Sequence, residues 1–187
     1  MHRFQRIAIV GTSGTGKTTL AQQVGRQLGI AHIELDALHW EPNWTAAPSE
    51  VFRARVAEAL AGDCWVADGN YSSVRDLVWG RADTIVWLDY SFGLVLWRSL
   101  RRAIWRSTSD VELWSGNRET WRQTFFSRDS ILLWVLQTYH RRRREYPLLL
   151  SQPEYAHLSV VRVRSPQETR SWLIGLTGDG VIGGGLQ

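Results

Sequence analysis

The sequence predicts an α/β protein in which helices flank a five-stranded parallel sheet, and three observations support this prediction. Short apolar runs, rich in β-branched residues, alternate along the 187 residues with longer segments of helical periodicity. A glycine-rich octet, residues 11–18, joins the first run to the first helical segment. Aspartates follow the next three runs, at Asp36, Asp68 and Asp89. Because parallel strands bring their carboxyl ends to one edge, these segments are expected to meet in one crevice.

The expected elements follow one another in a regular order. Strands are expected at 6–10, 31–35, 65–67, 84–88 and 158–163, where the runs are short and apolar, as in a buried parallel sheet. Apolar spacing and terminal glycine or proline predict helices from the octet to Gly29 and at 49–60, 72–79, 94–106, 119–126, 129–144 and 166–174. Residues 36–48 and 107–117 are expected loops. We expect one domain over 1–177, and the five glycines of 178–187 predict a disordered tail.

The octet completes the pattern G-x-x-x-x-G-K-[ST] between a strand and a helix. Its glycines allow backbone N–H groups to surround phosphate oxygens, and the helix dipole adds a positive field. Lys17 is the single lysine of the chain, whereas the other 21 of its 22 basic residues are arginine. The octet therefore predicts a P-loop NTPase that binds ATP with Mg²⁺, with the Thr18 hydroxyl on the metal. The expected nucleotide-binding residues are Gly11, Thr12, Ser13, Gly14, Thr15, Gly16, Lys17, Thr18 and Thr19.

Composition and charge narrow the class of protein. Apolar content of 44% and charged content of 21% are ordinary for a globular protein. The single cysteine, Cys64, is expected to be a buried, inert thiol at the start of a strand, which fits a reducing compartment. With no apolar stretch near the roughly 20 residues that span a bilayer, we expect a cytoplasmic protein without a membrane partner. The net charge of +4 suits phosphorylated substrates and also nucleic acid.

Segments outside the octet resemble those of a known group. They are HIELDALHW at 32–40 with PNW at 42–44, WVADGNYS at 65–72 and RADTIVWLD at 81–89. Together with the octet they resemble the adenylate-kinase-like bacterial proteins often labelled DNA topology modulation proteins, over roughly residues 6–175. The wider relatives are nucleoside monophosphate kinases and shikimate- or gluconate-type kinases. The resemblance implies a P-loop kinase fold, ATP with Mg²⁺ and a small-molecule acceptor.

The resemblance also suggests which aspartate serves the metal. Asp68-Gly69 resembles the D-G of the adenylate kinase motif D-G-F-P-R, in which the aspartate holds the Mg²⁺ shell. Residues 70–72, Asn-Tyr-Ser, replace F-P-R, so the arginine that grips the AMP phosphate is missing. Thr18 and Asp68 are therefore the expected metal residues. Asp89, which also ends an apolar strand, is the alternative metal residue, or else the N-cap of the following helix.

The acceptor is expected beside the second strand. Asp36 occupies the place where shikimate-type kinases hold an acceptor hydroxyl with an aspartate, and it is a candidate base. An ordinary cap at the strand end is the alternative role for Asp36. Loop residues near it are expected either to line the acceptor pocket or to pack beneath it. The candidate acceptor-binding residues are Asp36, His39, Trp40, Trp44, Asp68, Gly69 and Tyr71.

Arginines cluster in the second half of the chain. Arg98 and Arg102 share one helix face, and Arg122 and Arg128 follow the expected loop 107–117. Adenylate kinases carry lid arginines in comparable places, so the resemblance implies a helical, arginine-rich lid over about 98–128 that closes on phosphate. A solvated basic face is the alternative. The run 141–144 is expected at a helix end, where positive charge complements the dipole, with a nucleic-acid patch as the less favoured interpretation.

These observations predict an ATP-dependent phosphotransferase that moves the γ-phosphoryl group to an unidentified small acceptor. The alternative hypothesis is a nucleotide-gated nucleic-acid-binding or regulatory P-loop NTPase, suggested by the arginine excess. The expected catalytic residues are Lys17, Asp36, Asp68, Arg98, Arg102, Arg122 and Arg128.

Overall fold

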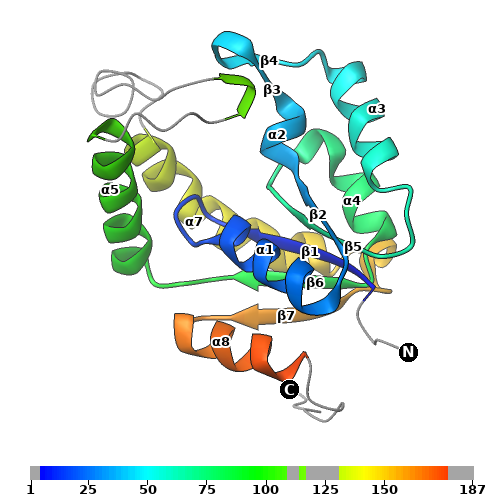
Figure 1. The fold of residues 1–187 in the computed structure, drawn as a ribbon. Helices are drawn as coiled ribbons and strands as arrows, with labels where there is room; N and C mark the ends of the chain where they lie inside the picture. The colour runs from blue at the N-terminus through cyan, green and yellow to red at the C-terminus, as the bar shows by residue number, and fades with distance from the viewer. Residues whose placement is uncertain (1–4, 109–113, 117–130, 177–187) are drawn as a thin grey trace.

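A computed structural model describes residues 5–108, 114–116 and 131–176. Five parallel strands form its main sheet in the order β2-β5-β1-β6-β7 (Figure 1). Their bounds are β1 Arg6–Gly11, β2 Ala31–Glu34, β5 Trp65–Asp68, β6 Thr84–Leu88 and β7 Ser159–Val163. This arrangement confirms the predicted five-stranded parallel sheet flanked by helices.

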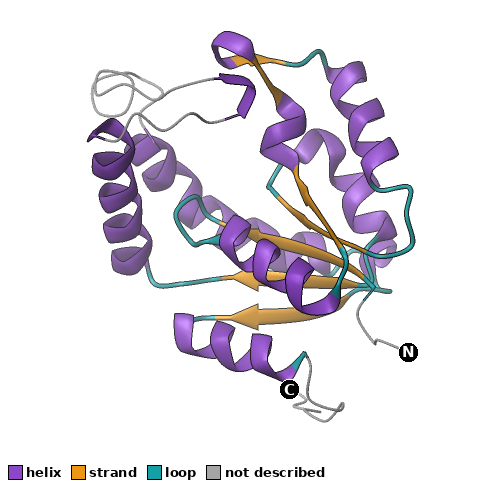
Figure 2. Ribbon diagram, viewed as in Figure 1, coloured by secondary structure: helices purple, strands orange, loops and turns teal. Residues whose placement is uncertain are grey.

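Helices lie on both faces of the sheet (Figure 2). Helices α1 and α8 cover one face, and α3, α4 and the C-terminal part of α7 cover the other. Helix α5 stands at the carboxyl end of the sheet and packs against α7 (Figure 1). The helical bounds are α1 Lys17–Leu28, α3 Ser49–Ala59, η2 Ser72–Val74, α4 Arg75–Arg81, α5 Phe92–Thr108, η3 Trp114–Gly116, α7 Ile131–Leu150, η4 Pro153–Tyr155 and α8 Pro166–Gly175.

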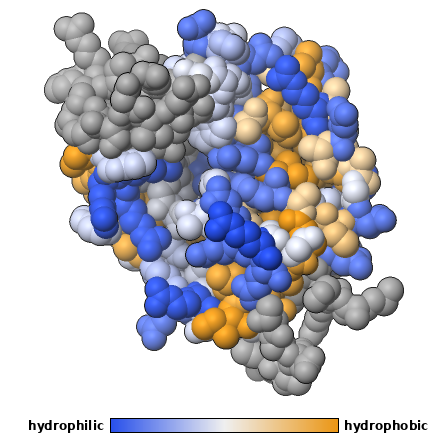
Figure 3. Space-filling model, in the orientation of Figure 1, coloured by the Kyte–Doolittle hydropathy of each residue, from blue (hydrophilic) through white to orange (hydrophobic). Residues whose placement is uncertain are grey.

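Alternation along the strands divides the core into two clusters. Ile7 and Ile9 of β1 pack with the α1 face, whereas Ala8 and Val10 pack with α3 and α4, because successive strand side chains point to opposite faces. The outer face of α1 is polar, and hydrophilic residues occupy the middle of the view in Figure 3, where this helix lies. The amphipathic pattern of α1 therefore buries one side of the helix on the sheet and leaves the other to solvent.

The expected loop 36–48 is more ordered than its sequence suggested. Strand β2 ends at Glu34, and helix α2, Leu35–His39, begins at once, so Asp36 lies on a short helix. An antiparallel hairpin follows, built from β3 Trp40–Glu41 and β4 Thr45–Ala46 around η1 Pro42–Trp44. Asn43 and Trp44 both have positive φ, at 59° and 54°, which a tight turn requires and which most residues avoid.

Two expectations about the chain were wrong. Helix α7 continues past 144 to Leu150 with Pro147 inside it, so the arginine run lies within the helix and the helix dipole does not explain it. Cys64 is exposed, because it precedes β5 instead of belonging to it.

Several expected features lie outside the described residues: the helix 119–126, the tail 178–187, and Arg122 and Arg128 of the expected lid. Of the expected loop 107–117, residues 107 and 108 are the last of α5, and 114–116 form η3. None of the described helices is long and apolar enough to cross a bilayer.

Candidate active site

The P-loop connects the end of β1 to the start of α1. Gly11, Gly14 and Gly16 have φ of 152°, 84° and 92°, in a region that side chains with a Cβ rarely adopt. A Cβ on Gly14 would lie 2.2 Å from the hydroxyl of Ser99 on α5. The loop is therefore a backbone cradle, held closely against α5, of the kind that surrounds phosphate groups.

Lys17 is the first residue of α1, and its ammonium lies over the loop. The Nζ atom donates to the carbonyl of Thr12 at 3.3 Å. Burial, followed by the nearby charge of Arg142, lowers the pKa of Lys17 to about 8, although Asp36 and Asp68 act in the opposite direction. The surrounding protein thus provides too little negative charge for this ammonium, and nucleotide phosphates would supply it.

The metal candidates Thr18 and Asp68 are in direct contact. The Thr18 hydroxyl donates to Asp68 Oδ2 at 2.7 Å, and His32 Nε2 lies 2.7 Å from the other carboxylate oxygen. Asp68 is 3% exposed and ends β5, the strand beside β1. A buried carboxylate and a hydroxyl are hard oxygen ligands that fit Mg²⁺, directly or through its water.

Asp89, the alternative metal residue, has different partners. It follows β6 on the other side of β1, and its carboxylate pairs with Arg162 at 2.6 Å and Arg143 at 2.8 Å. Arg162 also lies over the ring of Trp87, 4.3 Å from the ring centroid. Asp89 therefore connects the end of β6 to β7 and α7 through ion pairs. Of the two aspartates, it is Asp68 that contacts Thr18.

Two of the expected lid arginines reach the P-loop from α5. Arg98 Nη1 donates to the carbonyl of Thr15 at 3.2 Å, and Arg102 Nη2 donates to the hydroxyl of Ser13 at 2.8 Å. Helical spacing places both on one face of α5, as predicted. Their positive charges are thus already beside the loop that would hold the nucleotide.

The candidate acceptor side centres on Asp36 and Tyr71. The Tyr71 hydroxyl donates to Asp36 Oδ1 at 2.6 Å and is itself hydrogen-bonded by the indole of Trp40. Burial, followed by the nearby Asp36 charge, raises the pKa of Tyr71 far above its ordinary value. Tyr71 therefore stays protonated and orients the Asp36 carboxylate as a hydrogen-bond acceptor.

Aromatic rings extend this side of the site. His39 packs against Phe52 and Tyr71, with ring centroids 4.8 and 4.5 Å away, and its Nδ1 is buried without a partner among the described residues. Trp44 lies edge-on between Trp40 and Trp114, at 5.6 and 6.3 Å. The hydroxyl of Ser115 donates to the carbonyl of Trp40 at 2.8 Å, so η3 contacts the hairpin.

An unpredicted carboxylate lies beside Asp68. Glu34 pairs with it in the register of β2 and β5, and its pKa is raised, first by burial and then by Asp68 and Asp36, while a hydrogen bond from Trp114 opposes the shift. The sequence offered one signal for Glu34, which is an acidic residue near the end of the predicted strand 31–35, just before Asp36.

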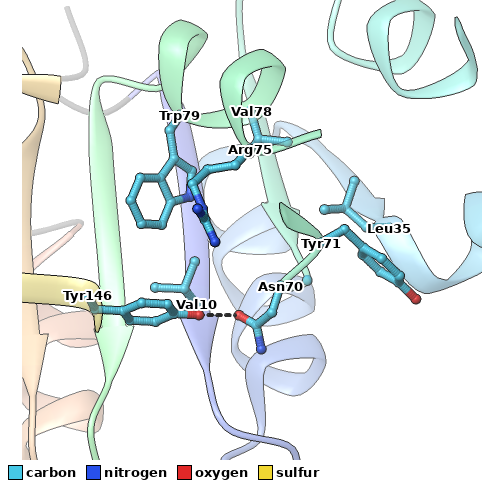
Figure 4. A pocket seen from close by; sticks show the side chains of 9 residues that line it. Val10, Leu35, Asn70, Tyr71, Arg75, Val78, Trp79 and Tyr146 are labelled. Atoms are coloured by element: carbon cyan, nitrogen blue, oxygen red, sulfur yellow. Dashed lines mark hydrogen bonds between the residues drawn. The ribbon is translucent and has the colours of Figure 1, made fainter. Parts of the chain in front are cut away.

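Asn70 connects the two sides of the site. Its Oδ1 accepts from the backbone N–H of Gly11 at 3.3 Å, and its Nδ2 donates to the carbonyl of the same residue. The hydroxyl of Tyr146, on α7, donates to Asn70 Oδ1 at 3.0 Å (Figure 4). From the sequence, Asn70 was considered only as a replacement within the D-G-F-P-R motif. An asparagine that follows a glycine at the end of a strand is typical of a turn, and in the structure Gly69 does have a positive φ.

Comparison with known proteins agrees with this geometry. The model of the ATPase family associated with various cellular activities matches residues 7–67. No curated protein matches the chain. A shikimate kinase from Acinetobacter baumannii in complex with shikimate has a similar structure, with 17% identity, a TM-score of 0.55, and coverage of 92% of this chain and 90% of that one.

Two further solved structures are similar. A gluconokinase from Sinorhizobium meliloti 1021 has 22% identity and a TM-score of 0.54, with coverage of 94% of this chain and 93% of that one. A shikimate kinase from Aquifex aeolicus has 15% identity and a TM-score of 0.51, with coverage of 93% and 97%. The fold is that of a P-loop kinase. Identity at this level shows the fold alone, so the roles of the site residues rest on their geometry.

Proposed function

We propose that the protein is an ATP-dependent phosphotransferase that transfers the γ-phosphoryl group of ATP to a hydroxyl of a small acceptor. The observation that carries this proposal is the contact of Thr18 with Asp68 at 2.7 Å, directly beside Lys17. The phosphate cradle, the Lys17 cation and this pair of oxygen ligands therefore lie together at one end of α1. Asp36 and Tyr71 lie at the neighbouring strand ends, where an acceptor would face the nucleotide.

Each residue has a distinct part in the proposed reaction. The acceptor oxygen forms a bond to the γ-phosphorus as the bond to the β–γ bridging oxygen breaks, and ADP leaves. Asp36 accepts the hydroxyl proton, and Tyr71 holds the carboxylate in place. Lys17, Arg98 and Arg102 neutralise the charge of the transferring group. Thr18 and Asp68 would hold Mg²⁺, which supplies further positive charge to the phosphates.

The similar structures support this class of reaction. Shikimate kinases and a gluconokinase are named for hydroxylated small molecules, and this chain shares their fold. We infer that the acceptor here is also a hydroxylated small molecule. Membership in the DNA topology modulation group remains a prediction from the sequence segments, as do the cytoplasmic location and the lid roles of Arg122 and Arg128.

The hypothesis of a nucleic-acid-binding protein has less support. It drew on the arginine excess, and many of these arginines serve internal contacts. Arg143 and Arg162 pair with Asp89, Arg98 and Arg102 contact the P-loop, and Arg142 is buried. These contacts leave fewer guanidinium groups for a phosphate backbone.

The substitution Lys17→Met tests the proposed function. Radiolabelled ATP would be incubated with nucleoside monophosphates, sugars and hydroxy acids, and label transfer measured with the wild type and the variant. We expect transfer to at least one acceptor, and a loss of roughly 10³-fold or more in the variant. The melting temperature should stay the same or rise, because a buried ammonium is removed. The proposal would be contradicted if transfer persisted in Lys17→Met, or if the wild type transferred label to none of the acceptor classes.

A further inference from the structure

Asp68, the metal candidate, has a second partner to which the proposed reaction gives no role. His32 is on β2, at the edge of the sheet, and its Nε2 lies 2.7 Å from Asp68 Oδ1. The His32 side chain is only 19% exposed. The other carboxylate oxygen, Oδ2, accepts from the Thr18 hydroxyl. Asp68 therefore has one hydrogen-bond partner on each oxygen, and the presence of a histidine in this position requires an explanation.

The sheet places His32 where it can reach Asp68. In the register of β2 and β5, His32 pairs with Val66, which belongs to the core cluster beneath α1. Asp68 follows Val66 by two residues, so both side chains point to the same face of the sheet. A Cβ on Gly25 of α1 would lie 3.5 Å from the Cβ of His32, so α1 packs closely against this histidine. The imidazole is therefore held by a strand and a helix, which position a side chain more precisely than a loop does.

The chemistry of this pair determines which atom donates. An ionised carboxylate only accepts hydrogen bonds, so Nε2 of His32 carries a proton and donates it to Asp68. An imidazole can donate in its neutral form, whereas a guanidinium is always charged. The Thr18 hydroxyl is a neutral donor as well. These two donors fix the orientation of the carboxylate and leave its negative charge available to a cation.

Asp89, the other strand-end aspartate, has the opposite kind of partners. Its carboxylate pairs with Arg143 and Arg162, which together carry more charge than it does. The chain has 22 lysine and arginine residues and only 5 histidines, yet the ring beside Asp68 belongs to a histidine. Arginine partners suit a carboxylate that connects parts of the fold. Neutral donors suit a carboxylate whose charge serves a metal.

We propose that His32 is a positioning residue for Mg²⁺, which fixes the Asp68 carboxylate and, through it, the Thr18 hydroxyl. This inference rests on the proposed kinase function, because it deepens the assignment of Thr18 and Asp68 as the metal residues. Since the Thr18 proton is donated to Asp68, the lone pairs of the Thr18 oxygen remain available to a cation. Partners that orient metal ligands in this way typically contribute about 10–100-fold to metal affinity.

Binding of ADP tests this role without an acceptor and without turnover. The melting temperature of the full chain would be measured against ADP in EDTA, and then against Mg²⁺ in the presence of ADP. His32→Leu removes the donor, and we expect the Mg²⁺ affinity of the ADP complex to fall by about tenfold or more. ADP binding in EDTA should stay unchanged, because Lys17 and the loop backbone are untouched. If ADP binding in EDTA weakens as much as Mg²⁺ binding, His32 only supports the P-loop and the proposal is wrong.

A conservative variant and a control examine the hydrogen bond itself. His32→Gln keeps a neutral N–H donor, and we expect it to retain most of the Mg²⁺ affinity. His157→Leu is the matched control, because Nε2 of His157 also bonds a protein oxygen, the carbonyl of Trp79 at 3.2 Å. His157 precedes β7, at the opposite edge of the sheet from the P-loop. An equal loss of Mg²⁺ affinity in His32→Leu and His32→Gln, or in His32→Leu and His157→Leu, would overturn the role of His32.

A double variant shows whether His32 acts through Asp68. Asp68→Asn already lacks the charge that His32 orients, so the addition of His32→Leu should lower the Mg²⁺ affinity no further. Substitutions of residues that act as one unit are not additive, whereas those of independent residues are. Additive losses of Mg²⁺ affinity would therefore contradict the proposal.

The failure of this inference differs from the failure of the kinase function. Phosphoryl transfer by the wild type, with an unchanged Mg²⁺ affinity in His32→Leu, would overturn the positioning role and leave the kinase. Mg²⁺ binding that depends on His32, without transfer to any acceptor class, would overturn the kinase function and leave the positioning role.

Discussion

The donor and acceptor sides of the site are built in different ways. The donor side is one continuous segment, residues 11–18, whose backbone conformation forms the phosphate cradle. The proposed acceptor side consists of side chains from separate elements, with Asp36 on α2 and Tyr71 before η2. A continuous backbone site leaves a pattern in the sequence, whereas a site assembled from distant side chains does not. This difference explains why the sequence identifies the nucleotide more readily than the acceptor.

The largest expected effect separates the two strand-end aspartates that the sequence left as alternatives. Asp68→Asn should lower kcat by about 10²–10³-fold with little change in stability, because it removes a proposed metal ligand. Asp89→Asn should leave kcat of the folded protein unchanged but lower the free energy of unfolding by about 2 kcal/mol, since Arg143 and Arg162 lose their shared partner. Steady-state kinetics and urea denaturation of both variants measure the contrast. Equal loss of kcat in both variants would show that the geometry assigns the metal residue wrongly.

The sequence could predict the sheet and the donor side because local patterns determine them. Short apolar runs predicted all five strands, and the octet located the P-loop. Asp68 and Asp89 are locally equivalent, since each ends a buried strand. The strand order distinguishes them, because it places β5 on the side of β1 where Thr18 lies and β6 beside Arg162 of β7. That order follows from packing of the whole chain.

The acceptor side could be predicted only in part. The sequence indicated Asp36 and Tyr71 as neighbours, and their hydrogen bond agrees with that expectation. The burial of Arg142 was missed because the run 141–144 was expected at a helix end, whereas α7 continues to Leu150. A run of four arginines looks uniform in sequence, but in the helix Arg142 is buried and Arg143 reaches Asp89.

An intermediate effect is expected at Asn70, the residue that joins the two sides. Asn70→Ala removes both contacts to Gly11 and the acceptor for the Tyr146 hydroxyl, so we expect a loss of roughly 1–3 kcal/mol in stability and a higher KM for ATP. Tyr146→Phe is the matched control, since it removes only the contact of α7. In that variant KM for ATP should stay near the wild-type value. A change in KM for ATP of similar size in both variants would argue against separate donor and acceptor sides.

The smallest expected effect is a pH dependence of stability confined to the acceptor side. Burial lowers the pKa of His39 from 6.5, although Asp36 opposes the shift, so the folded protein holds the imidazole neutral against Phe52 and Tyr71. As pH falls below 6.5, the unfolded chain takes up a proton that the folded chain does not, and stability declines by at most about 1.4 kcal/mol per pH unit for this one proton.

In His39→Phe, which keeps an aromatic ring in this cluster, urea denaturation midpoints above and below that pH should differ less than in the wild type. His140→Gln, which removes an exposed imidazole from α7, is the control for the effect of losing a histidine elsewhere on the pH dependence of stability. An equal flattening in His39→Phe and His140→Gln would mean that the acid sensitivity is spread over the molecule and does not belong to the acceptor wall.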